Sequence, residues 1–238
     1  MKAIQIVGFK KSGKTTLAAA LARELRSRGV SLAAAKFTHH ERLDQEKADT
    51  QILMDACEGP VAFFGPEETA LFWNKRRYLP DLLPLMNADV LIVEGGKTLG
   101  YMPRVILPRS AEDIEELDDE NVRLALGSYG EVEVPGLPRI RSAAELAGLT
   151  LSRGFILPGL NCKACGLASC RRMAAKIVAG KASPEDCAAE NAGMTVTVNG
   201  HALGLNPFVE NIIKEGIRGM LSQLKGYAPG TVKITLDV

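Results

Sequence analysis

No apolar run in this 238-residue sequence approaches the about 18 residues that a membrane-spanning helix needs. The first residues, MKAIQIVG, enter a strand pattern at once and lack the charged, apolar and small-residue zones of a secretory signal peptide. The 29 Lys and Arg nearly balance the 28 Asp and Glu, so the formal net charge is +1. Such a balance provides no long-range field for nucleic acid or an anionic membrane. We therefore expect a cytoplasmic protein whose partners are neither nucleic acids nor membranes.

Repeats and low-complexity tracts are absent as well, and the composition is that of an ordinary globular protein, with 46% hydrophobic and 24% charged residues. The length suits one large domain with a small second unit. Five cysteines are present. In a reducing compartment, they argue against disulfides and for metal binding or reactive thiols.

Strand and helix patterns alternate through the first 150 residues. Residues 3–7 form a short apolar strand, 14–28 a helix with leucines four residues apart, and 88–96 a buried strand. Further strands are expected at 31–37, 61–65, 69–73, 104–107 and 122–128, with a broken helix at 78–86 and a solvated acidic helix or loop at 112–120. The pattern predicts an α/β fold with a mostly parallel sheet and helices on both faces.

Composition changes after this region divide the chain into three parts: a large α/β domain at 1–152, a small cysteine domain at 153–192 and a C-terminal unit at 193–238. We expect the C-terminal unit to be a short α+β structure. Its expected elements are a hairpin at 195–205 turning at Asn199-Gly200, an amphipathic helix at 207–225 and a final strand at 231–238. The helix would pack on the hairpin and on the final strand.

The stretch VGFKKSGKTTL contains the complete pattern G-x-x-x-x-G-K-[ST], between an expected strand and an expected helix. Its glycines let backbone N–H groups curl round phosphates, and the helix N-terminus adds favourable partial charge. Lys14 can reach the terminal phosphates, and the Thr15 hydroxyl can ligate magnesium. The motif therefore predicts that residues 1–152 are a nucleotide-binding domain with the P-loop NTPase fold. An ordinary glycine turn is the alternative. The candidate phosphate-binding residues are Gly8, Lys11, Ser12, Gly13, Lys14, Thr15 and Thr16.

A P-loop site also needs an acidic group at the end of a neighbouring strand. Glu94 ends the expected strand at 88–96, where it could hold magnesium or orient an attacking water, although it could also be a surface carboxylate. Lys97 follows in the same loop. Further candidates after the second strand are His39, His40, Asp44 and Asp49, which could instead be structural or solvated. Arg77 stands where a guanine-reading N-K-x-D motif needs aspartate, so the residues leave GTP and ATP open.

The segments GFKKSGKTTL, KFTHH, KADT and LIVEGGK occur in the order and spacing typical of the molybdopterin-guanine dinucleotide biosynthesis protein B (MobB) family. The first 110 residues resemble this family well. The resemblance implies a homodimeric GTP-binding protein with weak hydrolysis. Such a protein would assist the guanylyltransferase that attaches GMP to molybdopterin.

Matching positions carry the implied roles onto this chain. By these matches, Gly13, Lys14 and Thr15 would bind phosphate and magnesium. Asp49 and Glu94 would bind the metal or position the catalytic water, and His40 would lie near the site. The chain departs from the family where Phe37 replaces histidine and Gly96 replaces phenylalanine. These departures leave base specificity and pterin contact open.

Cys162, Cys165, Cys170 and Cys187 form C-x2-C-x4-C-x16-C, which can hold an iron–sulfur cluster or a zinc ion. Basic residues surround the motif, a short helix is expected at 169–180, and SPED is a typical helix start. The whole stretch resembles the 4Fe–4S-binding domain of corrinoid iron–sulfur proteins. Cys57 lies outside the motif and is expected to be a buried apolar residue.

Three functions are compatible with these two halves. The leading hypothesis is a GTP-binding accessory protein of molybdenum or tungsten cofactor assembly, with Mg²⁺ and a 4Fe–4S cluster as cofactors. Its partners would be the guanylyltransferase, and molybdopterin or a client molybdo- or tungsto-enzyme. The alternatives are an ATP-driven chaperone that inserts a metal centre into a client, and a nucleotide-gated redox or binding module without significant turnover. In the leading hypothesis Lys14 and magnesium offset phosphate charge while Glu94 or Asp49 positions water.

Overall fold

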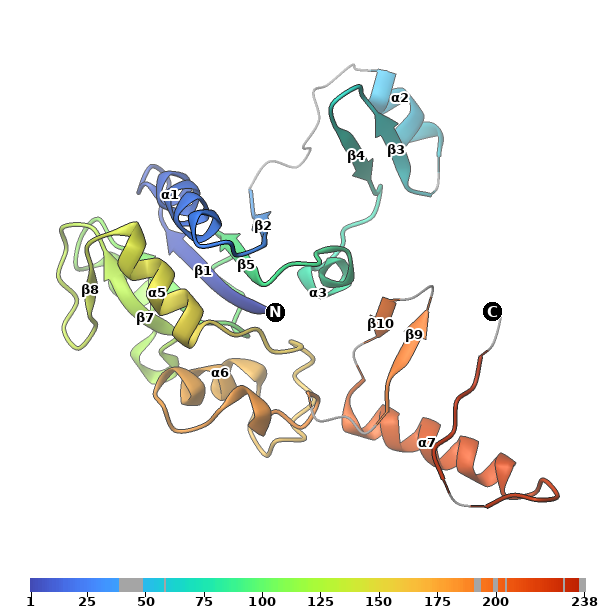
Figure 1. The fold of residues 1–238 in the computed structure, drawn as a ribbon. Helices are drawn as coiled ribbons and strands as arrows, with labels where there is room; N and C mark the ends of the chain where they lie inside the picture. Colours follow the sequence, from blue (N-terminus) through green and yellow to red (C-terminus); the bar gives the residue numbers. More distant parts are fainter. Residues whose placement is uncertain are drawn as a thin grey trace.

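A computed structural model describes residues 1–38, 49–57, 59–190, 194–198, 201–203, 205–228 and 230–235. Its centre is a six-stranded sheet in the order β2-β5-β1-β6-β7-β8 (Figure 1). The strands are β1 Lys2–Gly8, β2 Leu32–Lys36, β5 Val90–Glu94, β6 Arg104–Leu107, β7 Ala125–Tyr129 and β8 Arg139–Ile140. Every neighbouring pair is parallel, which confirms the predicted sheet. The short edge strand β8 had no sequence signal of its own.

Helices cover both faces of this sheet, as predicted. Alternate residues of β1 point to opposite faces, as the pleat requires. Ile4 and Ile6 share a core with α1 (Lys14–Ser27) and α5 (Ala143–Arg153). On the other face, α3 (Leu79–Leu82) packs near Ala3, and α4 (Asp113–Leu117) packs near Val7. The expected broken helix is present, because α3 continues as the 3₁₀ turn Leu83–Leu85.

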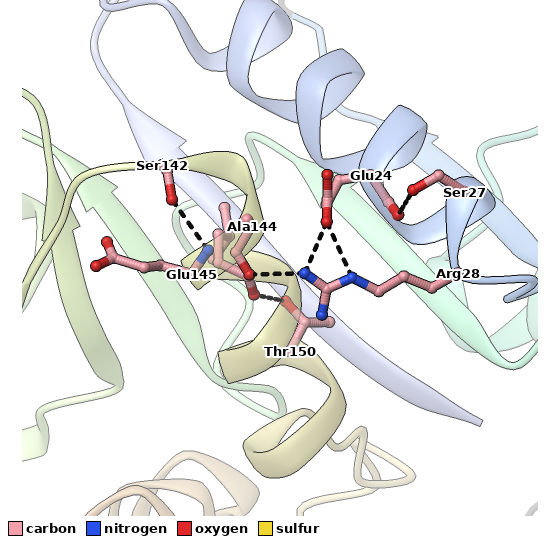
Figure 2. A network of polar contacts seen from close by, with 8 residues as sticks. Glu24, Ser27, Arg28, Ser142, Ala144, Glu145 and Thr150 are labelled. Carbon is pink, nitrogen blue, oxygen red and sulfur yellow. Dashed lines mark hydrogen bonds and ion pairs between the residues drawn. The ribbon is translucent and has the colours of Figure 1, made fainter.

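Polar contacts join α1 to α5 (Figure 2). The Arg28 guanidinium donates to Glu24 Oε1 at 2.7 Å and to the carbonyl of Ala144 at 3.1 Å. Ser142 caps α5 by accepting the Glu145 N–H at 3.1 Å. These contacts fix α5 on α1. They therefore also fix the point beside the sheet at which the chain leaves α5 and enters the cysteine segment.

The two strands expected at 61–65 and 69–73 are present but do not join the main sheet. β3 (Val61–Phe64) and β4 (Thr69–Phe72) pair antiparallel with each other and pack with α2 (Asp49–Ala56). Figure 1 shows this unit standing apart from the six-stranded sheet.

The acidic run at 112–120 is only partly solvated, so the prediction of a solvated segment was wrong. Leu117 is fully buried at the end of α4, and Asp118 beside it is 1% exposed. Asp118 Oδ1 accepts the backbone N–H groups of Leu124 and Ala125, both at 2.9 Å. Burial raises the pKa of Asp118, and these hydrogen bonds oppose that rise.

The C-terminal hairpin is confirmed. β9 (Val196–Val198) and β10 (His201–Leu203) pair antiparallel, with Val198 opposite His201. The predicted turn, Asn199-Gly200, lies outside the described residues.

The predicted amphipathic helix is α7 (Pro207–Leu221), which begins after an Asn206 cap that accepts the Val209 N–H. Its expected packing was wrong, because no residue of α7 is buried. The final strand was also wrong in its described part, since residues 231–235 have no strand structure. Among the described residues, no helix is long and apolar enough to cross a bilayer.

Candidate functional site

The loop between β1 and α1 is curled by two residues in the left-handed region, Lys11 at φ 65° and Gly13 at φ 87°. Gly13 directly precedes α1, so the unpaired N–H groups of the first helical turn face the loop. The loop surrounds a cavity of about 310 Å³ lined by Lys11, Ser12, Gly13, Lys14, Thr15 and Thr16. A polar cavity at a helix N-terminus is suited to a phosphate chain.

Gly8 ends β1 at a point where no side chain fits. A Cβ atom at Gly8 would lie 2.4 Å from Ser12 Oγ and 2.9 Å from the carbonyl oxygen of Leu107. The Ser12 hydroxyl is buried there without a hydrogen-bond partner among the described residues. The first glycine of the motif is therefore required by close packing of the loop on β6.

Lys14 begins α1 and turns back over the loop, where its Nζ donates to the carbonyl of Phe9 at 2.6 Å. Burial lowers the pKa of this ammonium group, whereas the nearby Glu94 raises it. Further lowering comes from neighbouring cations, namely Lys97, Lys36 and Arg109. Lys14 thus lies within a concentration of positive charge.

Thr15 and Glu94 meet beneath the loop. The Thr15 hydroxyl donates to Glu94 Oε1 at 2.7 Å, and Lys36 Nζ lies 3.4 Å from the same carboxylate oxygen. Sheet register explains this meeting, because Glu94 on β5 pairs with both Ile6 on β1 and Lys36 on β2. The two residues proposed from sequence for magnesium are thus brought together.

Two cations lie over the ring of Phe9, the first residue after β1. Lys97 Nζ is 3.6 Å from the centroid of its ring, and Arg109 Cζ is 4.9 Å from it. Each cation also has a carboxylate partner: Lys97 bonds to Glu116 at 2.5 Å, and Arg109 bonds to Asp113 at 3.2 Å. Lys97 was a sequence candidate, whereas Arg109 was missed because no local motif marks it.

Four adjacent strands each bring one cation to this edge of the sheet. Lys36 ends β2, Lys97 follows β5, Lys14 follows β1, and Arg109 follows β6. Sequence reasoning gave no role to Lys36 or Arg109, since strand order had to be known before they could be placed beside the loop.

The histidine segment cannot be placed, because His39, His40 and Asp44 lie outside the described residues. Asp49 is the first residue of α2, and α2 packs with β3. In Figure 1 this unit stands apart from α1. The described structure therefore does not bring Asp49 to the phosphate loop.

All four motif cysteines are free thiols that line one small cavity. Cys187 is buried, and the other three are half-buried. The same cavity is bordered by Pro158, Leu160, Lys163, Ser169, Met173, Ala188 and Ala189. Among the described residues, no three His, Cys, Asp or Glu side chains converge on a position for a single metal ion.

The chain around the first cysteine takes left-handed turns at Asn161 (φ 48°), Lys163 (φ 61°) and Gly166 (φ 76°). Asn161 directs its backbone N–H to Cys170 Sγ at 3.3 Å, while its side chain accepts the Cys170 N–H at 2.9 Å. Burial raises the pKa of the Cys170 thiol, the Asn161 N–H lowers it, and the three neighbouring cysteines raise it again. Four thiolates here would need a positively charged group between them.

Two short helical elements carry the later cysteines. α6 (Cys170–Val178) begins after Ser169, whose hydroxyl accepts the Arg172 N–H at 3.3 Å. The 3₁₀ turn Pro184–Asp186 begins at Ser183 with a capping box and ends beside Cys187. Both helix starts expected from the sequence are present.

Comparison with known proteins gives the chain a family. Residues 3–126 match the sequence model of the family described as "Molybdopterin guanine dinucleotide synthesis protein B". The chain belongs to the MobB family. Residues 157–189 match a second family, described as "Putative Fe-S cluster". Together these matches confirm the MobB resemblance and the appended iron–sulfur domain.

Individual relatives agree with this placement in the MobB family. Over its full length the chain is 27% identical to the Methanocaldococcus jannaschii protein called "Putative molybdopterin-guanine dinucleotide biosynthesis adapter protein", and the match covers 98% of that protein. It is 28% identical to the Haemophilus influenzae "Molybdopterin-guanine dinucleotide biosynthesis adapter protein", in a match that covers 54% of this chain and 76% of that protein. The crystal structure of Bacillus subtilis MobB matches 64% of the chain and 97% of its own, with TM-score 0.52 and 25% identity.

Proposed function

We propose that this MobB-family protein is an adapter of molybdopterin-guanine dinucleotide biosynthesis that binds magnesium GTP at its phosphate loop and hydrolyses it weakly. In this proposal the cysteine cavity holds a 4Fe–4S cluster. The observation that carries the nucleotide site is the 2.7 Å hydrogen bond between Thr15 and Glu94, beneath a complete phosphate-binding loop.

Phosphate binding would use groups already directed at the loop. Backbone N–H groups from Lys11 to Thr16 would surround the β-phosphate, as in other P-loops. The Lys14 ammonium would exchange the Phe9 carbonyl for a phosphate oxygen, which is a stronger acceptor because it is charged. Lys36, Lys97 and Arg109 would offset the remaining negative charge.

Thr15 and Glu94 supply the hard oxygen atoms that Mg²⁺ prefers, so the residues present fit this ion. Mg²⁺ bound there would offset charge on the phosphates. Glu94 is already bonded to Thr15 and lies 3.4 Å from Lys36, which suits metal holding better than proton abstraction. The family resemblance assigns orientation of the attacking water to Asp49 and a place near the site to His40. Because α2 stands apart from α1 (Figure 1), Asp49 would have to approach the loop when nucleotide binds, which is consistent with weak hydrolysis.

The cysteine cavity has the donor set for an iron–sulfur cluster: four free thiols, with the Asn161 N–H directed at one sulfur. Cys162, Cys165, Cys170 and Cys187 would be its ligands. A bound 4Fe–4S cluster supplies one-electron redox chemistry and a fixed point for docking. The protein would act as a homodimer with the guanylyltransferase, and with molybdopterin or a client enzyme.

The test is anaerobic purification followed by calorimetric titration with magnesium GTP and then magnesium ATP. A clear preference for GTP supports the adapter function. A preference for ATP favours the metal-centre chaperone, which the missing guanine-reading motif keeps in view. Absence of binding to either contradicts the nucleotide site. Iron, sulfide and zinc analysis of the same sample decides whether the cavity holds a cluster.

A further inference from the structure

One segment of the chain contacts both candidate sites. Residues 95–102, here called the linking loop, follow Glu94 on β5 and lead to β6. Its first half carries Lys97, whose ammonium lies over the ring of Phe9. Its second half contacts the cysteine domain. The separation of the two sites in sequence therefore conceals a direct physical connection.

The first half of the linking loop is tightly held. Gln5 Nε2 donates to the carbonyls of Gly95 at 2.7 Å and Gly96 at 2.6 Å. Both glycines have positive φ, and a Cβ atom at Gly96 would lie 3.0 Å from the ring of Phe37. The backbone here has little freedom to move independently of β1 and β2.

The middle of the loop is held by Arg104 on β6, which is 1% exposed. Its guanidinium donates to the carbonyls of Lys97 at 3.3 Å, Leu99 at 2.5 Å and Leu117 at 3.2 Å. A buried guanidinium that holds three carbonyls is costly to disturb. The position of Lys97 over the phosphate loop thus depends on the path of the linking-loop backbone.

The second half of the loop lies against the cysteine domain. A Cβ atom at Gly100 would be 2.8 Å from Cβ and 2.9 Å from Cγ of Arg171, the residue after Cys170. At the next residue, the Tyr101 carbonyl accepts the Leu157 N–H at 2.8 Å. The Tyr101 ring lies where a Cβ at Gly159 would meet it at 3.2 Å. The start of α6 therefore supports the linking loop directly.

We propose that Arg171 is a positioning residue for the nucleotide site: its side-chain stem, packed on Gly100, holds the linking loop and with it Lys97. This inference rests on the proposed function. A cluster bound through Cys170 fixes the first turn of α6 and so fixes Arg171. Without that bond, the Gly100 end of the loop loses its support from Arg171, so nucleotide binding has to order that end itself and is weaker. Because linkage of binding free energies is reciprocal, bound nucleotide also tightens cluster binding, and we expect slower loss of the cluster to a chelator.

The experiment measures magnesium GTP dissociation constants by calorimetry for cluster-loaded and cluster-free protein. Removal of the cluster should weaken binding by about fivefold, the lower end of ordinary coupling between sites. Gly100→Ala should weaken binding to loaded protein by a similar factor and remove its dependence on the cluster, because the new methyl group displaces Arg171. Gly148→Ala on α5, where a Cβ meets nothing within 4 Å, is the matched control and should behave as wild type.

A second pair of variants tests the stem itself and covers the case in which Gly100→Ala does not fold. Arg171→Met keeps the stem and should retain the coupling, whereas Arg171→Ala should lose it. A second readout is the rate at which a chelator bleaches the cluster's visible absorbance, which magnesium GTP should slow in wild type and in Arg171→Met but not in Arg171→Ala.

The outcomes separate this inference from the proposed function. Equal dissociation constants for loaded and cluster-free wild type would overturn the inference and leave the nucleotide site intact. Equal loss of coupling in Arg171→Met and Arg171→Ala would overturn the role of the stem. Failure of wild type to bind any nucleotide would instead contradict the proposed function.

Discussion

The phosphate loop and the cysteine loop both wrap backbone around a cavity, and each precedes a helix, α1 or α6. Among the described residues, the non-glycine residues with positive φ are Lys11, Asn161 and Lys163, and all three lie in these two loops. Left-handed backbone costs a residue with a side chain about 1–2 kcal/mol. Strain of this kind concentrates at ligand sites, where the surrounding structure can maintain it.

The two loops differ in what maintains that strain. The phosphate loop extends from β1, a central strand whose residues 3–8 are buried and contribute to the cores on both faces of the sheet. The cysteine loop depends on a smaller core made by Phe155, Leu157, Met173 and its own candidate ligand Cys187. We therefore expect that the phosphate site is preformed by the fold, whereas the cysteine site needs a bound group for part of its stability.

Lys14→Ala gives the largest expected effect on one site alone. Loss of the only ammonium directed into the phosphate loop from α1 should weaken magnesium GTP binding about 100-fold or more, as calorimetry would measure. The cluster absorbance should be unchanged. Lys10→Ala, which removes an exposed charge outside the cavity lining, is the control. Loss of the cluster from folded Lys14→Ala protein would contradict the picture of two distinct sites.

Cys170→Ser should show the opposite asymmetry. Iron and sulfide content should fall to background, and the melting temperature should drop by about 5 °C, because a ligand that binds only the folded state no longer contributes. Magnesium GTP binding should weaken only severalfold, through the linking loop. Cys57→Ser, at an exposed thiol outside the motif, is the control; the burial expected for Cys57 from sequence was wrong. Unchanged melting would show that the cysteine loop is as preformed as the phosphate loop.

Replacing one left-handed glycine by alanine in each loop compares the rigidity of the two loops directly. Gly13 (φ 87°) and Gly166 (φ 76°) have no atom closer than 4.0 Å to a new Cβ, so each substitution introduces backbone strain alone. Gly13→Ala should lower the free energy of unfolding in urea by about 1–2 kcal/mol. Gly166→Ala should lower it less and should instead speed cluster loss to a chelator. A larger loss of unfolding free energy in Gly166→Ala than in Gly13→Ala would contradict the comparison.

Arg109→Ala should weaken magnesium GTP binding about fivefold, and the effect should shrink in high salt, because an exposed cation contributes through screened charge. Arg139→Ala, at the distant edge strand β8, removes the same charge away from the loop and should leave binding unchanged. Equal effects from the two variants would show that only net charge matters.

A pH dependence is the smallest expected effect. Burial lowers the pKa of Lys14 below its ordinary value of 10.5, so the free protein begins to lose this proton below that pH. Bound phosphate raises that pKa, so binding takes up a proton and affinity falls as pH rises towards 10.5. Calorimetry in two buffers of different ionisation enthalpy measures the proton uptake. Proton release, or uptake retained in Lys14→Ala, would assign the effect to another group.

The local sequence alone was enough to predict the elements that have strong local patterns. The buried strands β1 and β5, the helix α1, the phosphate loop and the spacing of the four cysteines could all be read from neighbouring residues. The family matches confirmed the MobB and iron–sulfur-domain resemblances that these motifs carry. Helix α5 gave a weaker signal and the two-residue strand β8 gave none, so both were missed. The described part of the final strand was assigned from β-propensity that no pairing strand satisfied.

The spacing of nearby residues in the sequence thus identified the candidate phosphate-binding and metal-binding residues, because those chemistries use residues a few positions apart. The tertiary structure decided what lies around them. Lys36 and Arg109 reach the phosphate loop only because β2 and β6 lie close to β1 in the sheet. Gly100 meets Arg171, 71 positions later in the chain, only because α6 packs beside the linking loop. Long-range packing depends on strand order and on burial of apolar faces, and no short stretch of sequence contains that information.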